Sequence, residues 1–420
     1  MRVNIAKLLL LAALAPASSV GIAQRSTALV GAEHAGSWVP VIGTLGSVSA
    51  ILGTLALGWI ADGGPADTRR RWTVVLSGAI AGIVGLVCMA IAPRLWMLAV
   101  GWMIAQFGCS GAMASTRALL AQALPKQRRR GATAMVVLSY LGVFIPSLIL
   151  LALPGAIWIS SIGFALLAAA LPAFILRPHE RPRSGPDVTA EGAVRATVAG
   201  SRPDPTADSP RLLSWPMILA IAFLSNISET VYFVYHPLDI AARLGGAWTD
   251  ATTRISTLVL VASLLGLLLT AAWFLCAPAI LAHPKALIVS AGILLGVSTA
   301  GRGVVDSIPA IVVLSLIHGA GTAACTTALF TTALDRAPVL RAGRSLGIYS
   351  AAGALGTLLG PLAGLAVLHA TSASGDYRPL FLATALGPLL WVALVLVAML
   401  RRPEGSGVGW RRRPGSTPGR

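Results

Sequence analysis

The strongest constraint on this chain is a series of apolar runs, each long enough to cross a lipid bilayer. A helix needs roughly 20 apolar residues for one crossing, because it rises only about 1.5 Å per residue. A mean hydropathy of +0.79 and a charged fraction of 11% exclude a water-soluble fold for 420 residues. The sequence predicts an all-α membrane protein with twelve transmembrane helices, near residues 8–31, 38–60, 72–92, 95–123, 132–153, 155–176, 213–238, 253–275, 285–305, 308–333, 344–369 and 379–400.

A polar segment divides these runs into two sets of six. Residues 177–212 contain six prolines and lack apolar periodicity, which predicts a disordered linker. We therefore expect a first six-helix half at 1–176, a second at 213–400, and a basic, disordered tail at 401–420. The order of Pro125, Gly131 and Pro146 in one half resembles that of Pro338, Gly347 and Pro361 in the other, which favours two pseudo-symmetric halves.

The distribution of positive charge predicts the topology. If both termini and the linker share one side, that side holds 25 of the 32 Lys and Arg residues, and the other side holds five, which are Arg94, Arg243, Arg254, Arg302 and Arg378. Cytoplasmic loops hold the excess of positive charge, so both termini and the linker are expected in the cytoplasm and the protein in the plasma membrane. A net charge of +17 scattered in this way does not predict nucleic-acid binding. Residues 1–23 also have the pattern of a cleaved signal peptide, but removing them would leave eleven spans and unequal halves.

The loop between the second and third spans carries a motif. It reads Gly58-Trp59-Ile60-Ala61-Asp62, followed by Arg69, Arg70 and Arg71. This resembles the signature loop of the major facilitator superfamily, in which an Asp precedes a basic cluster. A Gly lets a neighbouring helix approach closely, and the Asp can cap a helix and pair with the arginines as a latch on the cytoplasmic side.

Other positions resemble one group of that superfamily, the glycoside, pentoside and hexuronide symporters together with sucrose-transporter-like proteins. The matches are Trp102 and Gln106, Leu124-Pro125, Gln127-Arg128 through Gly131, and Gly343 to Gly347 leading to Gly360-Pro361. The chain departs from the group's pattern at Gly63, Trp72 and Gln122. The resemblance implies a twelve-helix transporter that moves a small solute by alternating access, and it adds Gln106 to the candidate site.

Charged and polar residues inside the spans are the candidates for a substrate or proton site, because a charge in the hydrocarbon layer costs at least a few kcal/mol. Glu229 is the one acidic residue that the predicted spans hold well inside. At helical spacing it shares a face with Asn226, Tyr232, Phe233 and His236. Aromatic rings beside hydrogen-bonding groups suit a sugar-like solute. The alternative is that this face only packs against neighbouring helices.

Three more ionisable residues fall inside spans, and the eleventh span carries glycines. His318, Arg25 and Arg117 could supply a proton relay or ion pairs, although either arginine could instead snorkel to an interface. The glycines of the eleventh span, together with a proline, predict close helix packing and bending. They are Gly353, Gly356, Gly360 and Gly364, with Pro361.

The preferred interpretation is a monomeric, proton-coupled secondary transporter of a sugar-like solute, with the lipid bilayer as its surroundings and no cofactor or metal. An exporter of a hydrophobic or cationic drug or natural product remains an alternative, although the antiporter signature expected near Gly142 to Pro146 is missing. A non-transporting sensor or scaffold is an alternative of another class. An enzyme is not expected, because the chain has no HExxH, GxSxG or GxxxxGK[ST] motif.

Overall fold

The computed structural model describes residues 2–62, 68–123, 128–176, 213–246, 248–336, 342–371 and 376–400. Over these ranges the chain is helical and contains no strand. The predicted linker at 177–212 and tail at 401–420 lie outside the described residues, as do Leu124-Pro125 and Gln127 of the motif after the fourth span.

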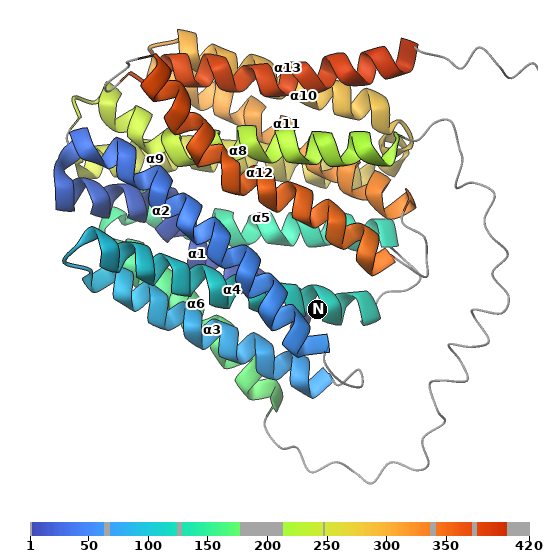
Figure 1. Ribbon diagram of the computed structural model, residues 1–420, viewed down its shortest axis with the longest axis horizontal. Coiled ribbons are helices and arrows are strands. Elements are labelled where there is room, and N and C mark those ends of the chain that lie inside the picture. Colours follow the sequence, from blue (N-terminus) through green and yellow to red (C-terminus); the bar gives the residue numbers. More distant parts are fainter. Residues whose placement is uncertain are drawn as a thin grey trace, which may run out of the picture.

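The helices before the linker follow the predicted spans closely (Figure 1). Their bounds are α1 Arg2–Pro16, α2 Ile22–Asp62, α3 Thr68–Ile91, α4 Leu95–Ala123, α5 Arg128–Ala152 and α6 Ile157–Leu176, with a π-helical turn at Ala17–Gly21 and a 3₁₀ turn at Pro154–Ala156. The first two predicted spans are separated by a kink inside α2, where Gly31 has φ 79°. Only glycine adopts that backbone conformation without strain, so the chain reverses there without a longer loop.

The helices after the linker also match the predicted spans. They are α8 Trp215–Arg243, α9 Asp250–Cys276, α10 Pro284–Val304, α11 Ile308–Arg336, α12 Ala342–Ala370 and α13 Arg378–Leu400, with a 3₁₀ turn at Pro278–Ala282. Eleven helical segments of the described chain are long and apolar enough to cross a membrane, and the apolar part of α5 at Val137–Ala152 is shorter. Helices satisfy their backbone hydrogen bonds internally, as a bilayer core requires.

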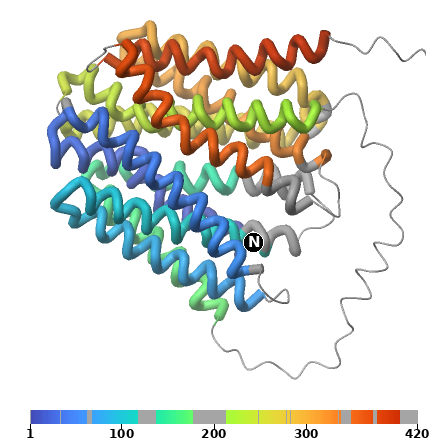
Figure 2. The backbone as a smooth tube through the Cα atoms, viewed as in Figure 1, coloured from blue at the N-terminus to red at the C-terminus, as the bar shows by residue number. Residues whose placement is uncertain are grey.

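The bundle has two ends, which we name by their residues. The linker face holds residues 62, 176, 215 and 400, and the far face holds residues 93, 153, 244 and 306. Helix α13 ends on the side where α1 begins (Figure 1). The helices before residue 177 lie mostly on one side of the bundle and those after residue 212 on the other (Figure 2). The two sets pack together through α5 against α9 and α2 against α12.

The glycines of α12 pack that helix closely against α8, as the sequence predicted. A Cβ at Gly356 would collide with the carbonyl oxygen of Phe223, and one at Gly360 would lie 2.9 Å from Cβ of Thr230. Gly58 was expected to permit a similar approach, and that expectation is wrong. A Cβ there would meet no atom within 4 Å among the described residues, because this part of α2 faces outward and neighbouring Trp59 is 80% exposed.

Two boundaries differ from the prediction in ways that matter for the site. Helix α8 continues through Pro237 to Arg243, whereas the predicted span ended at residue 238. Asp239 is therefore a buried acidic residue within α8, so Glu229 is not the only acidic residue inside a span. At the other face, Arg69, Arg70 and Arg71 lie in the first turn of α3 rather than in a loop, and Arg71 is buried. The side chain of Asp62, their expected partner, lies outside the described residues.

Candidate functional site

The carboxyl group of Glu229 lies at a small polar cavity among the helices that follow the linker. Helices α8, α10, α11 and α13 form this Glu229 cavity. Seven of its ten lining residues carry a polar side chain, and the lining residues are Ser225, Ser228, Glu229, Leu295, Thr299, His318, Thr322, Cys325, Thr326 and Pro388. Within the described residues, Glu229 has neither a hydrogen bond nor an ion pair. The cavity has room for about one water molecule and is too small for a sugar ring.

His318 of α11 also lines this cavity and is 1% exposed. Its Nδ1 atom lies 3.4 Å from the hydroxyl oxygen of Ser298 and 3.4 Å from that of Thr299. Its Nε2 atom is buried and has no hydrogen-bond partner among the described residues. The structure thus brings Glu229 and His318, two predicted site residues from different helices, to one cavity.

Tyr232 fixes the ring of His318. The two rings stack with centroids 3.7 Å apart and planes 10° from parallel. The Tyr232 hydroxyl lies 2.8 Å from the hydroxyl of Ser315, and Phe233 meets the His318 ring edge-on at 6.3 Å. Both aromatic residues of the predicted α8 face therefore support the histidine and do not line the Glu229 cavity.

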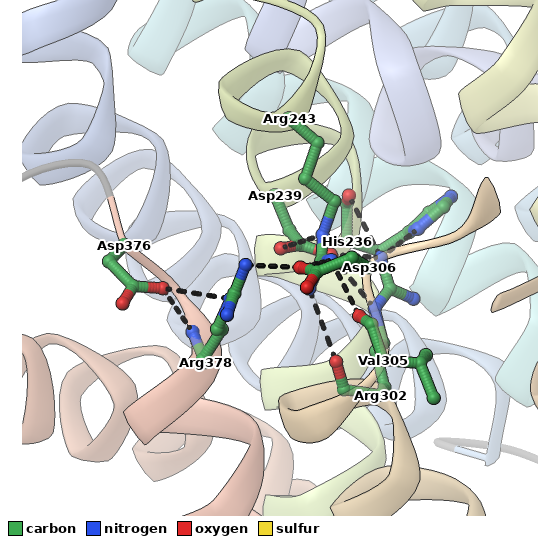
Figure 3. A network of polar contacts seen from close by, with 8 residues as sticks. All are labelled: His236, Asp239, Arg243, Arg302, Val305, Asp306, Asp376 and Arg378. Atoms are coloured by element: carbon green, nitrogen blue, oxygen red, sulfur yellow. Dashed lines mark hydrogen bonds and ion pairs between the residues drawn. The ribbon is translucent and has the colours of Figure 1, made fainter.

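A buried ion-pair network lies between this stack and the far face (Figure 3). The guanidinium of Arg302 is fully buried, and its Nη2 donates to Asp239 Oδ2 at 2.9 Å. The other carboxylate oxygen accepts from Arg243 Nε at 2.8 Å. Arg302 also stacks its guanidinium 5.0 Å from the Tyr232 ring centroid. Arg302 and Arg243 were predicted among the positive charges on the side opposite the linker, and both take part in this network.

The same network fixes the protonation pattern of His236. Its Nδ1 lies 2.8 Å from Arg302 Nη2, which can only donate, so Nδ1 accepts. Its Nε2 lies 2.7 Å from the carbonyl oxygen of Ser256, which can only accept, so Nε2 carries the proton. Both nitrogens are thus occupied in the neutral ring, and His236 acts here as a fixed part of the network.

Exposed residues extend the network to the far face. The carboxylate of Asp306, which is 70% exposed, pairs with Arg378 and lies 3.8 Å from Arg243. Asp376 accepts from the backbone N–H of Arg378 at 3.0 Å. These contacts hold the start of α13 against the ends of α8 and α10 (Figure 3).

Tyrosines from other helices lie near Glu229. Tyr140 of α5 packs against Ala323 of α11 and interacts electrostatically with Glu229. Tyr349 of α12 lies within the same range of Glu229 and of Cys325. Neither tyrosine is among the residues predicted for the site. Both lie inside predicted spans, and a tyrosine within an apolar span is a sequence signal that could have identified them.

The other predicted site residues lie elsewhere. Asn226 lies at the contact of α8 with α12, where its Oδ1 accepts from Thr357 at 3.3 Å. Arg25 donates twice to the carbonyl oxygen of Ala92, at 2.8 and 3.2 Å, and so holds the end of α3. Gln106 accepts from Ser110 within α4 at 3.3 Å. The side chain of Arg117 lies outside the described residues.

Comparison with known proteins shows the family. The sequence profile of the Major Facilitator Superfamily matches residues 8–300 of the chain. The chain belongs to the Major Facilitator Superfamily. No curated protein sequence matches it.

Solved structures of Major Facilitator Superfamily proteins share its fold. A mutant of the nucleoside transporter NupG is 13% identical, with a TM-score of 0.68, over 95% of this chain and 100% of that one. NupG without the mutation gives 11% identity, a TM-score of 0.68, and coverage of 96% and 99%. The human organic anion transporter MFSD10 (TETRAN) is 18% identical, with a TM-score of 0.63, over 94% of this chain and 98% of that one.

Membership of this superfamily settles the broad function. The chain is a multi-pass membrane transporter of small solutes and is not an enzyme. At identities below 20%, the solved structures show the fold alone.

Proposed function

We propose that this chain is a proton-coupled secondary transporter of a sugar-like solute, and that Glu229 carries the coupling proton. The observation behind this proposal is the carboxyl group of Glu229, which faces a polar cavity without a hydrogen bond or ion pair from the described residues. An unpaired carboxylate in a membrane-spanning helix is costly, and a bound proton removes that cost. The group therefore gains from binding a proton before the bundle rearranges and from releasing it to water afterwards.

The solute site is proposed between the two sets of helices, on the side of Glu229 that faces α5 and α12. Tyr140 on α5 and Tyr349 on α12 both interact electrostatically with Glu229. Phenol rings pack against the apolar face of a sugar, while their hydroxyls bond to its hydroxyl groups. A nucleoside, which NupG transports according to its name, offers the same combination of ring and hydroxyls.

The remaining parts of the proposal come from the sequence. Two halves, at residues 1–176 and 213–400, rock about the site between them. The protein is a monomer in the plasma membrane, and its linker face lies on the cytoplasmic side. The excess of Lys and Arg on that face supports this orientation. The resemblance of Gly343 to Gly347 and of Gly360-Pro361 to the glycoside, pentoside and hexuronide symporters supports a sugar-like substrate.

The test is transport by purified protein in liposomes that contain a pH-sensitive dye. Monosaccharides, disaccharides and nucleosides are added outside one at a time, with Glu229→Gln and empty liposomes alongside. We expect one class to acidify the interior, and Glu229→Gln to slow this by at least about 10-fold, the effect of a 1.4 kcal/mol rise in a barrier. No response to any of these solutes would overturn the substrate class. Equal responses of both proteins would overturn the role of Glu229, and flux of drug-like cations alone would favour an exporter.

A further inference from the structure

Two polar groups without a hydrogen-bond partner among the described residues meet at the Glu229 cavity, and that of His318 is fully buried. One is the carboxyl group of Glu229, and the other is Nε2 of His318. Buried polar groups in native proteins almost always have a hydrogen-bond partner, so each such exception needs an explanation. The unpaired Nε2 of His318 and the unpaired carboxyl group of Glu229 line one cavity although they are 89 residues apart in the chain, so one common explanation for both is simpler than two separate ones.

The cavity has the size and chemistry of a water site. It has room for about one water molecule, which needs two to four polar partners. The carboxyl group, the imidazole and the hydroxyls of Ser228, Thr299 and Thr322 all line it. A water molecule there can bridge Glu229 to His318 and complete the bonding of both.

The surroundings leave Nε2 as the atom of His318 that can exchange a proton with the cavity. Nδ1 lies near the hydroxyls of Ser298 and Thr299, and the ring stacks on Tyr232. Tyr232 is held in turn by Ser315 and by the guanidinium of Arg302. Arg302 is bound to Asp239, so its charge is already matched.

The other titratable groups around the pair lie on five helices. They are Tyr140 on α5, Tyr232 and His236 on α8, Arg302 on α10, Cys325 on α11 and Tyr349 on α12. His236 has both nitrogens occupied, by Arg302 and Ser256, and it does not line the cavity. His318 is therefore the imidazole placed to share a proton with Glu229.

We propose that His318 is the second proton-binding residue of this transporter and exchanges the coupling proton with Glu229 through one water molecule. This rests on the proposed function of Glu229. In the forward step, the O–H bond of protonated Glu229 breaks and its proton passes to the water, while a proton of that water forms an N–H bond at Nε2. A carboxylate and an imidazolium replace two neutral groups, so the net charge of the cavity does not change. The reverse step returns the proton to Glu229.

The first experiment needs no solute. Infrared spectra of the purified protein in detergent are recorded as a function of pH, and Glu229→Gln assigns the carboxylic acid band of Glu229. In His318→Leu we expect this band to move to higher frequency, because the acid has lost its water-bridged acceptor. His318→Gln keeps a hydrogen-bonding group and should shift the band less. His369→Gln, an exposed histidine on α12, is the control. An identical band in wild type and His318→Leu would overturn the proposal.

The second experiment separates proton transfer from folding. His318→Gln should keep solute counterflow within about twofold of wild type and should slow uptake driven by a pH gradient by at least about 10-fold. A merely structural role would reduce both rates together, and that result would overturn the proposal, as would no effect on either. If His318 variants do not give monodisperse protein, Thr299→Val, which removes one hydroxyl beside Nδ1, should shift the infrared band of Glu229, and an unchanged band would count against the proposal. Failure of wild type to move protons with any solute would overturn the proposed function, and the infrared result would still decide whether the two residues share the water.

Discussion

Asp239 binds Arg302 inside the helix bundle, with 2.9 Å between Oδ2 and Nη2 and with the Arg302 side chain fully buried. Buried charges persist only when they are paired, so each of these residues depends on the other for its place. Because Arg302 also stacks on Tyr232, which stacks on His318, the pair supports the wall of the Glu229 cavity from the far face.

Breaking this pair from one side should destabilise the protein strongly. Asp239→Asn leaves the Arg302 guanidinium buried without a counter-charge, and we expect a loss of about 3–5 kcal/mol in the free energy of unfolding. Thermal unfolding in detergent, followed by tryptophan fluorescence, measures the effect. Asp306→Asn, at a carboxylate that is 70% exposed, should cost at most about 1 kcal/mol.

A double variant tests whether the loss comes from the unpaired charge. Asp239→Leu with Arg302→Met removes both charges and should be more stable than Asp239→Asn alone. If the double variant loses as much as the sum of its single variants, the two residues act independently, contrary to the structure.

Much of the fold could be predicted from the sequence, because each helix that crosses a bilayer needs an apolar run of a minimum length. Apolar runs of sufficient length located the spans, and the glycines of α12 located a close helix contact. Glu229 and His318 stood out because ionisable groups are rare in such runs. The contact of Asp239 with Arg302 could not be predicted, since it joins residues 63 apart and depends on how α8 packs against α10. Asp239 also fell outside the predicted span, because a proline such as Pro237 often marks the end of a helix.

The close contact of α12 with α8 should not tolerate a side chain at Gly356. A Cβ would collide with the carbonyl oxygen of Phe223 and lie 2.9 Å from Cβ of Asn226. We expect Gly356→Ala to cost about 1–3 kcal/mol by overpacking and to lower the midpoint of thermal unfolding. Gly163→Ala in α6, where no atom lies within 4 Å of the new Cβ, is the matched control and should be neutral or slightly stabilising. Equal midpoints for the two variants would contradict the packing.

Removing the Tyr140 hydroxyl should weaken solute binding if the proposed site is correct. A lost hydrogen bond to a solute costs about 0.5–1.5 kcal/mol, so Tyr140→Phe should raise KM by roughly 2- to 13-fold with little change in the maximal rate. Uptake of labelled solute at several concentrations measures this. Tyr235→Phe is the comparison, because the Tyr235 hydroxyl donates to the carbonyl oxygen of Pro361 at 2.9 Å. It should lower thermal stability and leave KM unchanged.

The four cysteines offer a test of the predicted orientation without new labels. Cys276, at the end of α9 on the linker face, is exposed, whereas Cys109 and Cys325 are buried and Cys88 is half-buried. If the linker face lies in the cytoplasm, a membrane-impermeant maleimide should label inside-out vesicles and leave right-side-out vesicles nearly unlabelled. Cys276→Ser should abolish the labelling, which assigns it to this thiol. Labelling of right-side-out vesicles alone would reverse the orientation and would place the Asp239–Arg302 network on the cytoplasmic side of the Glu229 cavity.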